Sequence, residues 1–86
     1  MPGARMSLVY TPYSLRRLAL RGITQAEVQA VVDSRSKTVR PSRHGQGRKV
    51  HTAEIGGRRI SVVLGVGTTS VNTVVTAWCP DEGEGE

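Results

Sequence analysis

Residues 11–33, TPYSLRRLALRGITQAEVQAVVD, predict two helices joined by a tight turn. Thr11 is a favourable N-cap, and Pro12 fits the first helical position because the N–H that proline lacks has no partner there. Gly22 can adopt the left-handed conformation that commonly ends a helix. The first helix is therefore expected to begin after Thr11 and to end before Gly22.

The second helix follows almost at once. Thr24 and Glu27 have the spacing of a capping box, and Ile23 precedes the cap, where it can pack against Val28 one turn later. We expect a helix from about residue 26 to residue 32. Because this segment is rich in valine, which has a low helix propensity, tertiary packing must hold it.

Three polar side chains follow one face of the first helix. Tyr13, Arg17 and Arg21 recur every four residues, so a phenol and two guanidiniums lie one above another. Neither arginine has a carboxylate at helical spacing, so a partner outside the helix is expected, and phosphate is the obvious candidate. The alternative is a basic face that is simply solvated. The apolar residues of the helix point largely elsewhere and are expected to be buried: Leu15, Leu18 and Ala19.

The charge of the chain is unevenly distributed. The 86 residues carry a formal charge of +5, but all twelve Lys and Arg lie in residues 1–80 beside only three of the seven acids, which gives that part +9. A small body this basic favours a polyanionic partner, either nucleic acid or an acidic protein. Residues 81–86, DEGEGE, are acidic and Gly-rich. They predict a disordered tail after a single domain over residues 1–80.

Length and composition limit the class of protein. Eighty-six residues allow one small core of Val, Leu, Ile and Ala, which a homodimer or another bound partner would help to stabilise. The lone Cys79 excludes an internal disulfide and suits a reducing compartment. No segment is long and apolar enough to span a membrane, and no signal-peptide core is present. A soluble, cytoplasmic protein without membrane contact is therefore expected.

A basic segment follows the two helices. Residues 34–49, SRSKTVRPSRHGQGRK, contain six Lys or Arg, with a short edge strand expected at residues 38–40 and a basic loop at residues 40–47. Such a loop suits contacts with the phosphates of a nucleic acid, and the alternative is a solvated linker. The candidate nucleic-acid-binding residues are Arg40, Arg43, His44, Arg48 and Lys49.

From residue 50 onward the sequence alternates between apolar and polar residues. Residues 50–55, 59–66 and 71–79 predict three antiparallel strands, joined by Gly-Gly at 56–57 and by residues 67–70. Residues 7–10 are either a further short strand or the lead-in to the first helix. The order of elements predicts an α+β domain in which two helices pack on one face of an antiparallel meander sheet of three to four strands.

Alternation also predicts which side chains share a face of the sheet. His51 shares a face with Ala53, where it is either a structural residue or a functional one, and Arg59 in the next strand can lie near it. Thr76 is either a good strand former or a hydrogen-bond donor. In the last strand one face is expected to carry Val71, Val75, Ala77 and Cys79, and the other Asn72, Val74, Thr76 and Trp78. Trp78 is expected in the core rather than as a platform for stacked bases.

Several short motifs together resemble domain of unknown function 4258. They are Tyr13-x3-Arg17-x3-Arg21-Gly22-Ile23, a helix near Glu27-Val28, the hairpin GRRISVV at 57–63 and the closing strand TVVT at 73–76. The pattern of that domain looks like His-x3-Arg-x3-Arg-Gly-Ile, then a helix and a β meander ending in Val-Val-Thr. The resemblance covers residues 8–78. The domain is similar to the RelE/ParE and BrnT toxins, so the resemblance implies a RelE-like fold, a metal-independent ribonuclease, and an acidic antitoxin or immunity protein as partner.

This chain departs from the family pattern at one position, where Tyr13 stands in place of histidine. Three outcomes are open: Tyr13 takes over proton transfer, His51 does so, or the protein binds without cutting. An ordinary phenol is protonated at neutral pH, so a phenolate would need nearby cations such as Arg17, Arg21 and Arg59.

The residues themselves narrow the chemistry. The acids outside the tail, Glu27, Asp33 and Glu54, are widely separated and do not suggest a Mg²⁺ site, and two histidines with one cysteine do not suggest zinc. In metal-free cleavage of RNA the 2′-hydroxyl is the nucleophile. The protein then needs only proton transfer and cationic stabilisation of the phosphorane, and no cofactor is expected.

The leading prediction is therefore a metal-independent, RelE-like ribonuclease toxin that acts on RNA. Its predicted catalytic residues are Tyr13, Arg17, Arg21, His51, Arg59 and Thr76. One alternative is a basic module that binds nucleic acid without cleaving it. Another is a module that uses the basic face to bind an acidic protein alone.

Overall fold

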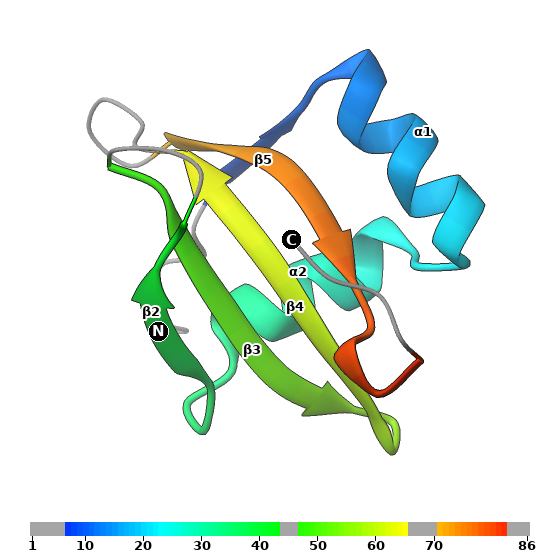
Figure 1. Ribbon diagram of the computed structural model, residues 1–86, viewed down its shortest axis with the longest axis vertical. Coiled ribbons are helices and arrows are strands. Elements are labelled where there is room, and N and C mark those ends of the chain that lie inside the picture. The colour runs from blue at the N-terminus through cyan, green and yellow to red at the C-terminus, as the bar shows by residue number, and fades with distance from the viewer. Residues whose placement is uncertain (1–6, 44–46, 66–70, 83–86) are drawn as a thin grey trace, which may run out of the picture.

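Two helices and a five-stranded mixed sheet form the part of the chain that the computed structural model describes, residues 7–43, 47–65 and 71–82 (Figure 1). The helices are α1 (Pro12–Arg21) and α2 (Gln25–Asp33), and a short 3-10 turn, η1, spans Pro80–Glu82. The strands are β1 (Ser7–Tyr10), β2 (Thr38–Pro41), β3 (Lys49–Ile55), β4 (Arg58–Gly65) and β5 (Val71–Trp78). Their order across the sheet is β1-β5-β4-β3-β2, which confirms the α+β class.

Helix α1 begins and ends at the residues that the sequence indicates, and α2 begins after the predicted cap Thr24 and extends to Asp33, one residue beyond the expected end. The Thr11 hydroxyl accepts a hydrogen bond from the Ser14 amide, and Gly22 ends α1 with a left-handed φ of 65°. In α2 the capping box is complete, because the Thr24 hydroxyl accepts from the Glu27 amide and the Glu27 carboxylate accepts from the Thr24 amide. These local bonds satisfy backbone groups that would otherwise lack partners at the helix ends.

The sheet is wider than predicted, and it is not wholly antiparallel. The meander β3-β4-β5 is present as expected, and Gly56 and Gly57 join β3 to β4 with positive φ angles of 61° and 80°. However, β2 pairs with β3 at one edge, and β1 pairs in parallel with β5 at the other. The prediction of an antiparallel sheet of three to four strands is therefore wrong. It failed because a four-residue strand carries no local signal for its partner. The predicted turn at residues 67–70 lies outside the described residues.

The main core lies between α2 and one face of the sheet. It contains Val28, Val31 and Val32 from α2, packed against apolar residues of the central strands such as Ile60 and Val62. In Figure 1 α2 passes behind the sheet. The opposite face, here called the distal face, carries a smaller buried cluster formed by Val50, Val63 and Trp78. Trp78 is only 3% exposed, as a core tryptophan should be.

A β-bulge in β5 reverses three of the predicted faces. Val63 of β4 pairs with Thr76, and the next residue, Leu64, pairs with Val74, so Val75 is an extra residue on β5. As a result Val74 lies in the main core and Val75 packs against the cluster on the distal face. The strict alternation predicted for this strand is therefore wrong at both valines and at Asn72, whose partner Leu8 packs against the main core.

The helix α1 packs on the side of the sheet, along β5, rather than over a broad face. Only Ser14 and Leu18 are buried in it, whereas Leu15 is 40% exposed and Ala19 is also exposed. The expected burial of Leu15 and Ala19 is wrong, because a helix at a sheet edge buries a narrow stripe. Among the described residues no helix is long and apolar enough to cross a membrane.

The first two residues of the predicted tail, Asp81 and Glu82, belong to η1, which lies against β4. The rest of that segment, residues 83–86, lies outside the described part of the chain.

Candidate functional site

The structure brings Arg21 and Thr76 together from 55 residues apart in the sequence. Arg21 Nη1 donates to Thr76 Oγ1 over 3.4 Å and to the backbone carbonyl of Ala77 over 2.7 Å. The second bond is the shorter and is charge-assisted, so it fixes the guanidinium at the edge of β5. Two of the residues predicted for catalysis are therefore neighbours.

Arg17 and Tyr13 lie on α1 one and two turns before Arg21. The Arg17 guanidinium carbon lies 5.3 Å from the centre of the Tyr13 ring, which is a cation–π contact, and Tyr13 is 53% exposed. Arg17 Nε is buried and has no hydrogen-bond partner within the described residues. We call Tyr13, Arg17, Arg21 and Thr76 the α1–β5 cluster. A buried N–H donor without a partner costs about 1–3 kcal/mol.

His51 does not join this cluster. It pairs across the sheet with Val39 and Val62, and Val62 lies in the main core, so the imidazole lies on the α2 face, opposite to the distal face. The side chain is 8% exposed, and its Nδ1 is buried with no partner in the described part of the chain. Burial lowers the pKa of His51, and the nearby cations Lys37 and Lys49 lower it further. The imidazole is therefore neutral and remote from Thr76.

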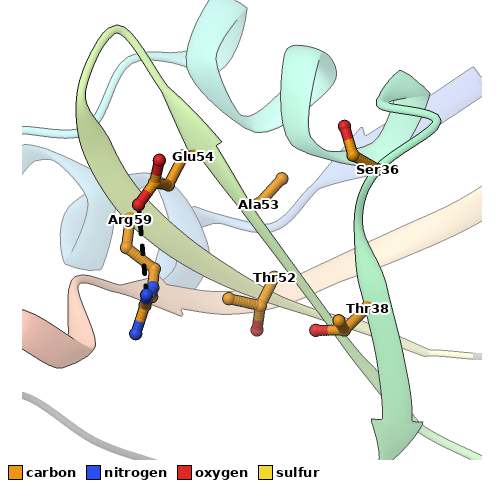
Figure 2. Close-up of a pocket in the computed structure, with 6 residues that line it drawn as sticks. All are labelled: Ser36, Thr38, Thr52, Ala53, Glu54 and Arg59. Atoms are coloured by element: carbon orange, nitrogen blue, oxygen red, sulfur yellow. Dashed lines mark ion pairs between the residues drawn. The ribbon is translucent and has the colours of Figure 1, made fainter.

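Arg59 lies on the distal face, where it pairs across the strands with Glu54. The expectation that Arg59 lies near His51 is wrong, because the register puts the two side chains on opposite faces. The Arg59 guanidinium forms ion pairs with Glu54 at 3.9 Å and with Asp81 at 3.6 Å. It borders an open pocket of about 650 Å³ at the β2–β3 edge, and Figure 2 shows its pairing with Glu54 there. The pocket lining also includes Ser36, Thr38, Thr52 and Ala53.

Arg58 is an organising residue that sequence reasoning missed. It donates to the backbone carbonyls of Arg21 and Gly22, each over 2.9 Å, and so caps the end of α1. It also pairs with Glu82 at 3.2 Å and with Glu27 at 3.9 Å, and the hydrogen bond to Glu82 raises the pKa of Arg58. The sequence shows two adjacent arginines, but only the strand register decides which of them reaches the helices.

The predicted nucleic-acid-binding residues lie at the other edge of the sheet. Arg40 belongs to a cross-strand row with Val50, Val63 and Thr76, so Arg40 and Thr76 are on the same face, three strand spacings or about 14 Å apart. The Ser42 amide donates to the Arg48 carbonyl over 3.0 Å and closes the loop between β2 and β3. Arg43, Arg48 and Lys49 are exposed there, and His44 lies outside the described residues.

No model of a protein family, no curated protein and no solved structure matches this chain. Within the described ranges, no three His, Cys, Asp or Glu side chains are grouped so that they could hold a metal ion.

Proposed function

We propose that the protein is a metal-independent ribonuclease with a RelE-like fold, related to domain 4258, and that the α1–β5 cluster binds the scissile phosphate. The observation that carries the proposal is the position of Arg17 and Arg21. Arg21 is held beside Thr76, and the buried Nε of Arg17 lacks a hydrogen-bond partner among the described residues. Two neighbouring guanidiniums on a helix without carboxylates suit a phosphate, which accepts several N–H bonds at once.

The proposed reaction needs no group beyond the RNA, solvent water and these side chains. The 2′-hydroxyl of the substrate attacks the phosphorus and gives its proton to a solvent water, and a 2′,3′-cyclic phosphate forms as the bond to the 5′-oxygen of the next nucleotide breaks. Arg17 and Arg21 stabilise the charge on the phosphorane, and Thr76 donates a hydrogen bond to one of its oxygens. The exposed Tyr13 phenol gives a proton to the departing 5′-oxygen. The same solvent then returns a proton to Tyr13, so the protons balance.

The distal face supports an RNA path away from the cluster. Arg40 and Thr76 belong to one cross-strand row, and Arg43 and Arg48 are exposed in the loop that follows β2. Contacts of this kind bind the sugar-phosphate backbone independently of sequence. The same basic surface suits an acidic antitoxin or immunity protein as a regulatory partner. The homodimer that would stabilise the small core stays a prediction.

A second candidate function is RNA binding without cleavage, and the position of His51 favours it. The imidazole is buried on the α2 face, so it cannot take the place of the histidine that Tyr13 replaces. In that case the α1–β5 cluster holds phosphate, but no group accepts the proton of the 2′-hydroxyl.

The two candidates are separated by incubating the purified protein with single-stranded RNA in excess EDTA. A ribonuclease leaves fragments that end in 2′,3′-cyclic phosphate or 3′-phosphate, whereas a binding module retains intact RNA. RNA that is neither retained at low salt nor cut would contradict both.

Variants of α1 test whether the cluster is the site. Arg17→Ala is expected to lower the rate about 100-fold, since a lost charge stabiliser typically costs that much. Arg16→Ala is the matched control, because Arg16 is the adjacent, exposed arginine of the same helix. Tyr13→Phe should reduce cleavage but leave RNA affinity nearly unchanged. Equal losses of cleavage rate in Arg17→Ala and Arg16→Ala would show that only the overall charge of α1 matters for cleavage.

A further inference from the structure

The acidic turn η1 contacts both arginines of the β3–β4 hairpin. Glu82 Oε2 lies 3.2 Å from Arg58 Nε, and Asp81 Oδ1 lies 3.6 Å from Arg59 Nη1. Figure 1 shows η1 next to the end of this hairpin. Two carboxylates of the same chain thus occupy two neighbouring guanidiniums, as an external polyanion would.

The two contacts differ in strength. Arg58 is also bound to two backbone carbonyls at the end of α1, so it has a structural role and anchors η1 through Glu82. Arg59 makes only long ion pairs, and the side chains of Arg59, Asp81 and Glu54 are 49%, 64% and 68% exposed. Exposed pairs of this kind contribute little and exchange readily with other ions. The contact between Asp81 and Arg59 can therefore be displaced.

The surroundings of Arg59 suit a sugar-phosphate unit. The guanidinium lies on the distal face, as does Thr76 of the α1–β5 cluster, and it borders the pocket lined also by Ser36, Thr38 and Thr52, whose hydroxyl is hydrogen-bonded to Ser61 (Figure 2). Hydroxyl groups can both donate to phosphate oxygens and accept from ribose hydroxyls. A phosphate at Arg59 would have such groups close by.

We propose that Arg59 is a second phosphate contact for RNA and that Asp81 of η1 occupies it until RNA displaces the carboxylate. The proposal rests on the proposed RNA-directed function and adds regulation in cis to it. RNA binding then includes a competition between a phosphate and Asp81 for one guanidinium, while Glu82 and Arg58 keep the turn attached. The acidic turn lowers the affinity for weakly held polyanions and leaves a strongly held RNA bound.

The test compares the affinity of full-length variants for a single-stranded RNA oligonucleotide and for inorganic polyphosphate, titrated with salt. Asp81→Asn is expected to raise the affinity about two- to fivefold at an ionic strength of about 50 mM, the range of an exposed ion pair. Asp33→Asn is the matched control, since it makes the same charge change at an exposed site on α2, which packs on the face of the sheet opposite to Arg59. Its effect should be clearly smaller.

The variant Arg59→Ala, alone and combined with Asp81→Asn, makes the comparison a double-mutant cycle. In the Arg59→Ala background, Asp81→Asn should raise affinity no more than Asp33→Asn does. In the Asp81→Asn background, Arg59→Ala should reduce the slope of log affinity against log salt by about 0.7, the value for one phosphate contact on a single strand. Both results support the competition at Arg59.

Two probes distinguish the failure of this inference from the failure of the proposed function. Equal gains from Asp81→Asn and Asp33→Asn would overturn the competition, whichever polyanion is bound. A gain specific to Asp81→Asn on polyphosphate, with no RNA retained by any variant, would support the competition and contradict an RNA-directed function.

Discussion

The guanidinium of Arg21 donates a 2.7 Å hydrogen bond to the backbone carbonyl of Ala77. β1 pairs with β5 only over residues 71–74, so at Ala77 the β1 side of β5 is covered by α1, while β4 pairs on the other side. The bond therefore fastens α1 to the sheet and at the same time holds the guanidinium beside Thr76. Stability and the proposed phosphate site depend on the same side chain.

Replacing Arg21 should destabilise the fold. Arg21→Met removes the charge-assisted bond and leaves a partly buried carbonyl without this donor, which should lower the free energy of unfolding by about 1–2 kcal/mol. Urea unfolding followed by circular dichroism measures the change. Arg16→Met is the control, and its effect should stay within about 0.5 kcal/mol, as for most exposed positions. Similar losses in both variants would show that the bond to Ala77 does not stabilise the fold.

Arg58 and Arg59 should differ in their effect on stability, although they are adjacent. Arg58→Met removes both donors from the carbonyls of Arg21 and Gly22, so it should lower the thermal midpoint. Arg59→Met removes only long, exposed ion pairs and should leave the midpoint nearly unchanged. Differential scanning calorimetry compares the two. A larger loss from Arg59→Met would contradict the assignment of Arg58 as the cap of α1.

The hydroxyls of Thr52 and Ser61 are hydrogen-bonded across β3 and β4 over 2.8 Å. Because Ser61 is buried, Thr52→Val alone leaves its hydroxyl without this partner, and each single variant should cost about 1 kcal/mol. The double variant Thr52→Val with Ser61→Ala removes both polar groups and should cost less than the two single losses combined. A double-mutant cycle in urea measures the coupling, and additive losses would show that the bond contributes nothing.

The buried His51 should make stability depend on pH. Its pKa is lowered from the ordinary value of 6.5, first by burial and then by Lys37 and Lys49, so the unfolded chain binds its proton more readily than the folded protein. The contribution of the neutral His51 to the free energy of unfolding is complete above about pH 6.5 and is lost as the pH falls through the lowered pKa. The free energy of unfolding should therefore decrease as the pH falls below about 6.5.

The variant His51→Leu should remove most of this decrease, because leucine has no proton to gain on unfolding. His44→Gln, which replaces the only other histidine, is the control and should retain it. If His51→Leu and the unmodified protein lose stability equally on acidification, other groups must cause the dependence.

Thr76 should matter for cleavage more than for folding. Thr76→Val keeps the shape of a half-exposed strand residue but removes the hydroxyl next to Arg21, so we expect roughly a tenfold lower rate of RNA cleavage with little change in unfolding. Thr73→Val makes the same substitution earlier in β5 and serves as the control. Equal rates for the two variants would remove Thr76 from the proposed site.

Local sequence signals were sufficient for the parts of the fold that neighbouring residues determine. The caps at Thr11, Gly22 and Thr24 define both ends of α1 and the start of α2, because their hydrogen bonds join residues only a few positions apart. The Gly56-Gly57 turn and the alternation around it predict the β3–β4 hairpin for the same reason. The spacing of Tyr13, Arg17 and Arg21 places them on one face of a helix wherever that helix packs.

Only the tertiary structure decided how these elements meet. The parallel pairing of β1 with β5, the bulge at Val75 and the choice of Arg58 to cap α1 depend on contacts between distant segments, whose energies no local pattern contains. The same is true of the site. Strand register puts Thr76 beside Arg21 and turns His51 to the α2 face, because moving one position along a strand moves a side chain to the other side of the sheet.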